Sequence, residues 1–139
     1  MPIIIDGWNL IRSDSSRITD IDRDSLEAAS ELISYLTDFQ RSRGDPITLV
    51  FDSTNEFLAI EYADSDKLKI IPARNADDYI KKHIDMTPER ERRNLRVISS
   101  DSSIFYYARS CYATPVRSED FWHKLKRNRK KKTPPSRYG

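Results

Sequence analysis

The strongest constraint on the fold is a series of short apolar runs, three of which lead into an aspartate. These three runs cover residues 3–5, 47–51 and 95–98, and the first consists of three consecutive isoleucines without polar alternation. Runs of this kind are typical of strands that are buried on both faces of a sheet. Asp6 and Asp52 follow the first two runs directly, and Asp101 follows the third after two serines.

Helical periodicity separates the predicted strands. Residues 25–43 place apolar side chains at helical spacing and end before Gly44, which favours one amphipathic helix. Further helices are predicted over 76–86, over 103–111 and from Ser118, and further strands over 68–71, closed by Pro72, and over 114–116. The charged run 89–93 is interpreted as a solvated connection. Alternating strands and helices predict an α/β fold with a parallel sheet, in which ligands bind beyond the carboxyl ends of the strands.

The aspartates that follow the strands are therefore expected to gather at one edge of the sheet. A fourth acid comes from the helix over 76–86, where Asp77 and Asp78 are adjacent and lie about 100° apart. Asp77 is three residues before Ile80 and seven before Ile84, so it shares their apolar face, and we predict that it faces the sheet. For each of these acids, simple capping of a turn or helix stays open as a structural alternative.

Clustered carboxylates repel one another unless a cation neutralises them. Mg²⁺ and Mn²⁺ take oxygen ligands and retain water molecules, so a few carboxylates at a strand edge are enough to hold one. The chain has only two histidines, His83 and His123, and neither has a partner at metal-ligand spacing. The sequence therefore predicts Mg²⁺ or Mn²⁺ as cofactor, and zinc is not expected.

The formal net charge of +2 conceals a segregation of the two signs. Residues 1–122 hold all 22 acidic residues and 16 of the 24 basic ones, a net charge of −6. The remaining 17 residues hold eight basic residues and no acid. A basic C-terminal segment on an acidic domain predicts a polyanionic partner.

Nothing in the sequence predicts a membrane segment or an export signal. The longest wholly apolar stretches run three to four residues, and the N-terminus lacks a cationic stretch followed by an apolar one. The single cysteine, Cys111, excludes an intrachain disulfide and is expected to be a small buried residue in a reducing compartment. We therefore expect a cytoplasmic protein without a membrane partner.

Four short motifs occur in order along the chain: Ile4-Ile5-Asp6-Gly7-Trp8-Asn9, Val50-Phe51-Asp52, Asn75-Ala76-Asp77-Asp78 and Ser99-Ser100-Asp101. Together they resemble the NYN domain family, specifically its YacP-like ribonuclease branch, within the PIN-like nuclease superfamily. The resemblance covers residues 2–125 and implies a PIN-like three-layer α/β/α fold with a mostly parallel central sheet. On this basis we expect a nuclease domain over residues 1–125 and a basic, disordered tail over residues 126–139.

The resemblance also implies metal-dependent cleavage of RNA phosphodiester bonds. The matching catalytic residues are Asp6, Asn9, Asp52, Asp77 and Asp101. Among them, Asp6, Asp77 and Asp101 would hold the metal ion, and Asp52 would act directly or through water. Asn9 would orient Asp6 or a phosphate oxygen, because an amide donates as well as accepts. Ser103 stands where PIN-like relatives frequently carry another acid, which leaves one metal ion or two open.

The predicted function is thus endonucleolytic cleavage of RNA by a metal-activated water. The basic tail would bind RNA phosphates without reading base sequence, through Lys124, Lys126, Arg127, Arg129, Lys130, Lys131 and Lys132. Ribosome association or a merely solubilising terminus would give the same pattern. The alternative is a catalytically inactive RNA-binding adaptor of the same fold. A haloacid-dehalogenase-type phosphatase is disfavoured because it needs D-x-D after the first strand, where this chain has Asp6-Gly7-Trp8.

Overall fold

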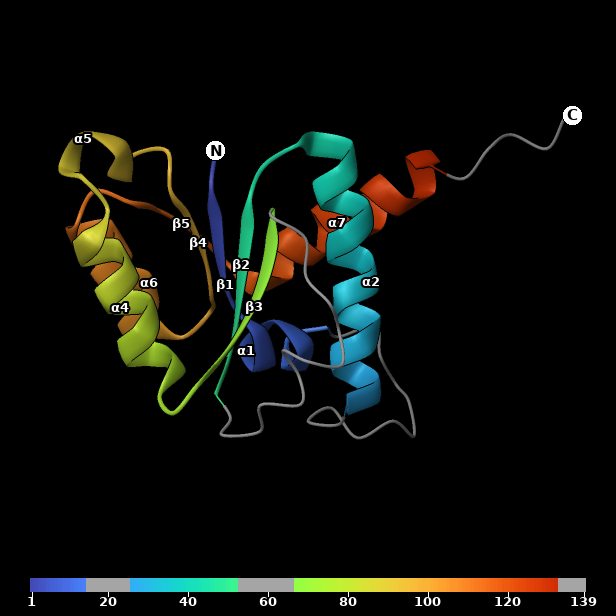
Figure 1. The fold of residues 1–139 in the computed structure, drawn as a ribbon, viewed down its shortest axis with the longest axis horizontal. Helices are drawn as coiled ribbons and strands as arrows, with labels where there is room; N and C mark the ends of the chain where they lie inside the picture. The colour runs from blue at the N-terminus through green and yellow to red at the C-terminus, as the bar shows by residue number, and fades with distance from the viewer. Residues whose placement is uncertain (15–25, 53–66, 133–139) are drawn as a thin grey trace, which may run out of the picture.

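The computed structural model describes residues 1–14, 26–52 and 67–132 (Figure 1). Within them the five strands form one parallel sheet in the order β3-β2-β1-β4-β5. In chain order the elements are β1 (Ile3–Asp6), α1 (Gly7–Arg12), α2 (Leu26–Arg43), β2 (Ile47–Asp52), β3 (Leu68–Ala73), α4 (Ala76–Met86), α5 (Glu89–Arg92), β4 (Arg96–Ile98), α6 (Ser102–Ser110), β5 (Thr114–Val116) and α7 (Ser118–Lys132).

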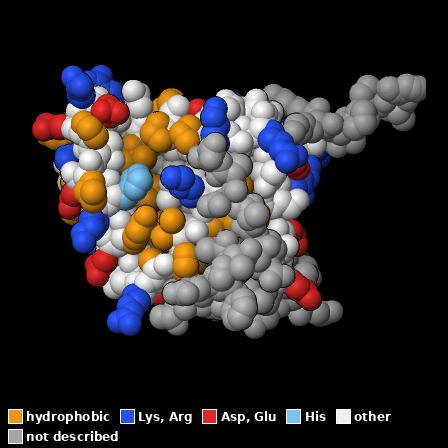
Figure 2. All heavy atoms as spheres, viewed as in Figure 1, with side chains coloured by type: hydrophobic (Ala, Val, Ile, Leu, Met, Phe, Trp, Pro, Cys, Tyr) orange, Lys and Arg blue, Asp and Glu red, His pale blue; other side chains and the backbone are white. Residues whose placement is uncertain are grey.

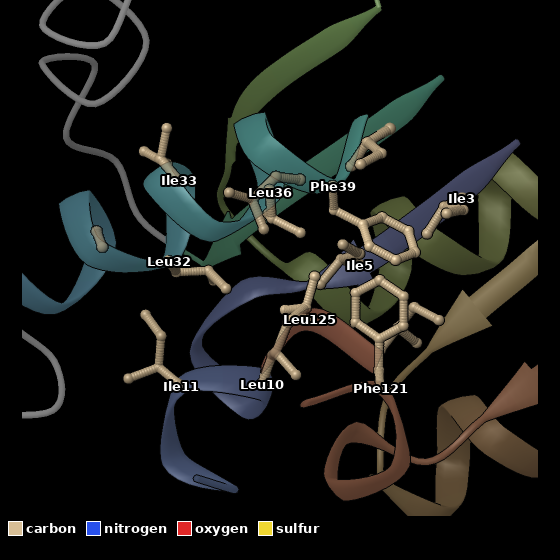
Figure 3. Packing of buried hydrophobic residues seen from close by; sticks show 14 of the residues in the cluster. Ile3, Ile5, Leu10, Ile11, Leu32, Ile33, Leu36, Phe39, Phe121 and Leu125 are labelled. Atoms are coloured by element: carbon tan, nitrogen blue, oxygen red, sulfur yellow. The ribbon is translucent and has the colours of Figure 1, made fainter. Parts of the chain in front are cut away.

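Helices cover both faces of the sheet, and each face has its own apolar core. Alternate residues of β1 divide between the two: Ile3 and Ile5 pack with α1, α2 and α7, whereas Ile4 packs with α4 and α6. Figure 1 shows α4 and α6 on one side of the strands and α2 and α7 on the other. In the core of Figure 3, the rings of Phe39 and Phe121 meet edge to face at 5.4 Å. The predicted three-layer α/β/α architecture is therefore confirmed.

The strand order places a topological switch between β1 and β4. From β1 the chain adds β2 and β3 on one side of the sheet, and then returns to add β4 and β5 on the other. In sheets of this type, connections that leave in opposite directions open a crevice at the carboxyl ends of the two central strands. Asp6 ends β1 and Asp101 lies just beyond β4, so both acids border the switch point.

The sequence prediction missed α1. A helix of six residues is too short to show helical periodicity, and this one begins at a glycine directly after a strand. Tertiary contacts stabilise it: Leu10 and Ile11 are buried, and Trp122 Nε1 on α7 donates a hydrogen bond to the Leu10 carbonyl. As a result, the residues after Asp6 stay at the edge of the sheet instead of leaving it as a loop.

The predictions at Pro72 and in the run 89–93 are corrected in detail. Pro72 lies inside β3 and does not close it, because β3 pairs with β2 alone and an edge strand tolerates a residue without an N–H. The charged run contains the short helix α5, in which no residue is buried. No helix among the described residues has both the length and the apolar character that crossing a membrane requires.

The predicted disordered tail is wrong for residues 126–132, which continue α7. Leu125 and Asn128 are buried, and Lys126 pairs with Asp14 at 2.7 Å. The helix is held by acids and apolar side chains that are distant in the chain, so the run of cations alone does not reveal it. The expectation for residues 133–139 falls outside the described part of the chain.

Candidate active site

The predicted catalytic residues come together in one pocket at the carboxyl edge of the sheet. The pocket has a volume of about 480 Å³, and all five of them line it: Asp6, Asn9, Asp52, Asp77 and Asp101. They come from the ends of β1 and β2, from α1, from the first turn of α4 and from the cap of α6. Asp78 does not line the pocket and is exposed, as the helical phase predicts.

Asp6 is half-buried, whereas Asp52 and Asp101 are exposed. Burial is the main cause that raises the pKa of Asp6 from 3.8 to about 6. The Ser99 hydroxyl, which donates a hydrogen bond to Asp6 Oδ2 at 3.4 Å, opposes this shift, and the charge of Asp101 adds to it. The surroundings of Asp6 thus disfavour the charged form of its carboxylate. A bound cation would favour that charged form.

Asn9 joins three segments behind the pocket. Its Oδ1 accepts hydrogen bonds from the backbone N–H of Ser100 at 2.9 Å and from the hydroxyl of the fully buried Ser118 at 2.7 Å. Ser100 Oγ in turn donates to the carboxylate of Glu119 at 2.8 Å. The side-chain oxygen of Asn9 therefore positions the turn that leads to Asp101, and Asn9 also forms a hydrogen bond with Asp6 through its backbone. The expected contact of Asn9 with a phosphate oxygen stays a prediction.

Replacing Asn9 with alanine is expected to lower the free energy of unfolding by about 2 kcal/mol, because it leaves a buried hydroxyl and a backbone N–H without an acceptor. Thermal or urea unfolding measures this effect. The matched control is Asn94→Ala, since Asn94 is exposed and its change should alter stability by less than about 0.5 kcal/mol. Equal stability of the two variants would show that the Asn9 contacts contribute nothing.

Asp77 and Asp101 make contacts with neighbouring residues at the starts of their helices. Asp101 Oδ1 accepts hydrogen bonds from the backbone N–H of Ser103 at 2.9 Å and of Ile104 at 3.3 Å, so Asp101 caps α6 as well as lining the pocket. Asp77 Oδ1 pairs with Lys81 Nζ at 2.9 Å. Lys81 Nζ also donates to Ser103 Oγ at 2.6 Å. Lys81 therefore connects two helices at the pocket.

Lys81 and Arg12 are the residues near the site that the sequence analysis missed. The signal for Lys81 was present, since it follows Asp77 by four residues, the spacing at which opposite charges meet on a helix. Arg12 lines the pocket three residues after Asn9, but its position depends on α1, which was not predicted.

Asp52 is held in place through its backbone. Trp8 Nε1 donates a hydrogen bond to the Asp52 carbonyl oxygen at 3.2 Å, and the Trp8 ring packs against Phe51 with centroids 4.7 Å apart. Both Trp8 and Asp52 line the acidic pocket. The contact fixes the end of β2 against the first turn of α1.

The donor chemistry of the pocket fits a hard divalent cation. Four carboxylates supply oxygen ligands of the kind that Mg²⁺ and Mn²⁺ prefer. In the described parts of the chain, no three His, Cys, Asp or Glu side chains converge closely enough to hold an ion together. Asp77 is paired with Lys81 and Asp101 caps α6, so ion binding would compete with Lys81 for Asp77.

The two histidines lie away from the acidic pocket. His83, Tyr79 and Met86 of α4 line a separate pocket of about 290 Å³. Figure 2 shows apolar side chains gathered around a histidine on the face that it presents. Burial lowers the pKa of His83 below its ordinary 6.5, so it is neutral at physiological pH. His123 is exposed on α7.

The basic residues of α7 divide between two faces of the helix. Lys126 pairs with Asp14, and Arg129 pairs with Asp38 at 2.9 Å and stacks over the Tyr35 ring at 3.6 Å. Lys124 is half-buried, and the side chains of Lys131 and Lys132 lie beyond those that the structure describes. Arg127 and Lys130 are exposed and, with His123 and Lys126, line a hollow of about 400 Å³.

The parallel sheet and the pocket place the protein in a class of three-layer α/β/α domains that carry acidic residues at the carboxyl edge of the sheet. The sequence model of the YacP-like NYN domain matches residues 3–137, and the chain belongs to this nuclease-like family. The match extends past residue 125. The family's domain therefore includes most of the segment that the sequence analysis treated as a tail.

Two solved structures share the fold. The crystal structure of Rae1 (YacP) from Bacillus subtilis is 16% identical with a TM-score of 0.71, over 94% of this chain and 76% of that one. Its W164L mutant is 18% identical with a TM-score of 0.73, over 94% of this chain and 79% of that one. Among curated proteins, none matches this chain.

Proposed function

We propose that this protein is a metal-dependent endoribonuclease that cleaves RNA phosphodiester bonds with a metal-activated water. The observation that carries the proposal is the gathering of Asp6, Asp52, Asp77 and Asp101 in one pocket from four separate elements. Membership in a nuclease-like family supports it. Four carboxylates at one site would repel the phosphates of RNA unless a cation lies between them, so the arrangement favours a metal-binding site over a surface that only binds RNA.

Asp6, Asp77 and Asp101 would hold Mg²⁺ or Mn²⁺, and Asp52 would contribute a further oxygen directly or through water. The bound ion would lower the pKa of a water molecule and polarise the scissile phosphate. Arg12 lines the same pocket and supplies a guanidinium that can bind phosphate oxygens. Trp8 is half-buried, which leaves part of its ring for an unpaired base to stack on.

Among the basic residues of α7 that were expected to bind RNA, those on the outer face of the helix are the ones that would contact it. Arg127 and Lys130 are exposed and lie three residues apart on one side of the helix, next to His123. Lys126 and Arg129 are paired with Asp14 and Asp38 and contribute less to phosphate binding. Cellular or ribosomal RNA would meet this face through its phosphates alone.

Metal dependence of cleavage tests the proposal. A labelled, structured RNA incubated with the wild type is expected to be cut with Mg²⁺ or Mn²⁺ and to stay intact with EDTA. Asp77→Asn, purified in the same way, should be inactive and thereby exclude a contaminating nuclease. Asp78→Asn changes an adjacent, exposed acid on the same helix and should retain activity.

The inactive RNA-binding adaptor is the second candidate. The observation that favours it is the contact of Lys81 with both Asp77 and Ser103, which places a cation of the protein beside the acids. RNA that is bound but stays intact under both metals would support the adaptor and contradict the ribonuclease.

A further inference from the structure

A second pocket lies at the opposite end of the sheet from the acidic pocket. It has a volume of about 810 Å³, and its lining includes Arg90, Arg93, Arg109 and Tyr112. Figure 1 shows α5 at the end of the sheet where the N-terminus lies and α1, which borders the acidic pocket, at the other end. We propose that this arginine–tyrosine pocket binds single-stranded RNA outside the cleavage site. The proposal rests on the proposed ribonuclease function and adds a second contact for the same substrate.

The three arginines bring three positive charges to a pocket that one acid, Glu89, also lines, so positive charge is in excess there. Arg90, Arg93 and Arg109 are exposed, and none of them forms an ion pair with a residue that the structure describes. Arg109 lies over the Phe105 ring at 5.4 Å, a contact that leaves its charge unpaired. Arg92 is different, because its guanidinium donates hydrogen bonds to two backbone carbonyls at 2.9 and 3.1 Å. Exposed guanidinium groups that share one pocket are suited to phosphate oxygens.

Tyr112 supplies the second, independent observation. It follows the end of α6 with a φ of 66°, in the left-handed region, and its side chain is 72% exposed. The backbone N–H of Ala113 donates to the Ala108 carbonyl at 2.9 Å, which closes the helix with the motif that normally carries glycine at this position. A tyrosine there strains the backbone and gains no burial in return. Strain without a packing benefit points to a ligand, and an exposed ring among arginines is a stacking platform for an unpaired base.

The geometry of α6 connects the two pockets. Asp101, which lines the acidic pocket, caps the start of the helix, and Cys111, which caps its end, directly precedes Tyr112. The nine residues of α6 span about 14 Å. An RNA strand held at the acidic pocket therefore reaches the arginine–tyrosine pocket within a few nucleotides. Since the acidic end repels phosphates, an anchor at this distance would supply affinity that the cleavage site lacks.

Binding of an unstructured RNA of about 20 nucleotides tests the inference. Fluorescence anisotropy is measured in EDTA on the Asp77→Asn chain, which should not cut the probe, between about 50 and 200 mM KCl. Adding Arg90→Gln, Arg93→Gln and Arg109→Gln should raise Kd at least about tenfold and reduce the slope of log Kd against log salt by about 0.7 for each phosphate that is no longer bound. Glu89→Gln removes the acid from the same pocket and should lower Kd.

The matched control removes the same charge elsewhere. Arg41, Lys69 and Lys82 are exposed on α2, β3 and α4, and their combined change to glutamine should alter Kd by no more than about twofold. An equal rise of Kd in the two triple variants would overturn the proposal, because the loss of net charge alone would then explain the weaker RNA binding. A poly-glutamate peptide that displaces the RNA at equal charge would overturn it as well, in favour of an acidic protein partner.

Tyr112→Gly separates a binding role from a structural one. Glycine removes the ring and relieves the left-handed strain, so Tm should not fall, while Kd for the RNA should rise at least about fivefold. A lower Tm with unchanged Kd would show that Tyr112 serves the fold alone. Because these measurements use a chain that should not cut RNA, absence of cleavage in the wild type would contradict the ribonuclease without changing their outcome.

Discussion

Replacing Asp6 with asparagine is expected to abolish RNA cleavage and, in the metal-free protein, to raise the free energy of unfolding at neutral pH. Asparagine keeps the size of the side chain and an acceptor for Ser99, but it removes the charge that would hold the proposed cation. Cleavage should fall at least about 100-fold, since the proposed metal ion would supply several kcal/mol of transition-state stabilisation.

The expected gain in stability depends on pH. Burial raises the pKa of Asp6 from 3.8 to about 6, so the protonated form stabilises the folded state below about pH 4, and this contribution is lost as pH rises through 6. The interval corresponds to about 3 kcal/mol, which the partial exposure of the carboxylate reduces to about 1–2 kcal/mol. Asp6→Asn should therefore unfold at a higher temperature than the wild type at about pH 7.5 and at the same temperature near pH 4.

Thermal unfolding in EDTA and then in Mg²⁺ measures both consequences. Mg²⁺ should stabilise the wild type and leave Asp6→Asn unchanged, because only the native wild type would bind the ion. Asp78→Asn is the control: Asp78 is exposed outside the pocket, and this variant should keep cleavage and gain no stability at neutral pH. If the Asp6→Asn variant still cuts RNA, Asp6 is not a ligand that the proposed metal ion requires.

Replacing Gly7 with alanine is expected to lower the free energy of unfolding by about 2–3 kcal/mol, because it overpacks the core beneath the site. A Cβ at this position would lie 2.7 Å from two ring carbons of Phe51 and 3.0 Å from the Val50 carbonyl oxygen. Phe51 is fully buried and its ring packs against Trp8, so it has no free space to move into. The strain falls between Asp6 and Asn9, and cleavage should weaken along with stability.

A double-mutant cycle identifies the cause. Urea unfolding of Gly7→Ala, Phe51→Leu and the double variant should show that the double variant loses less stability than the sum of the single variants, since the smaller leucine makes room for the Cβ. Gly44→Ala is the contrasting control, because nothing lies within 4 Å of its Cβ and its φ is +78°. It should lose about 1 kcal/mol through backbone strain alone, and Phe51→Leu should not rescue it. Strict additivity at Gly7 would exclude the steric explanation.

The strands, helices and clustered acids that the sequence predicted depend on patterns between residues that are close together in the chain. A run of three isoleucines after Pro2 is typical of a central strand, and the structure has it as β1, between β2 and β4. Parallel pairing then brings Asp6 and Asp52 to the same edge. The helical phase of Ile80 and Ile84 separated Asp77, which lines the pocket, from Asp78, which does not.

The features that the prediction missed depend on partners distant in the chain. α1 is held by Trp122, more than a hundred residues away, and the basic end of α7 is held by Asp14 and Asp38. Neither pairing leaves a periodic pattern in the local sequence. The run of basic residues resembles a solvated segment in the sequence, because the acids that pair with Lys126 and Arg129 lie far away in the chain.

The layered α/β fold and the set of acids that share one edge could be predicted from residue order, because strand burial, helix phase and parallel pairing follow from it. The contacts that support the site became visible only in the folded chain. In the structure, the Asn9 side chain accepts hydrogen bonds from Ser100 and Ser118, and Lys81 donates one to Ser103. Three arginines line one pocket with Tyr112 at the other end of the sheet. The physical reason is that each of these contacts is set by the packing of separate elements, which residue spacing along one element does not encode.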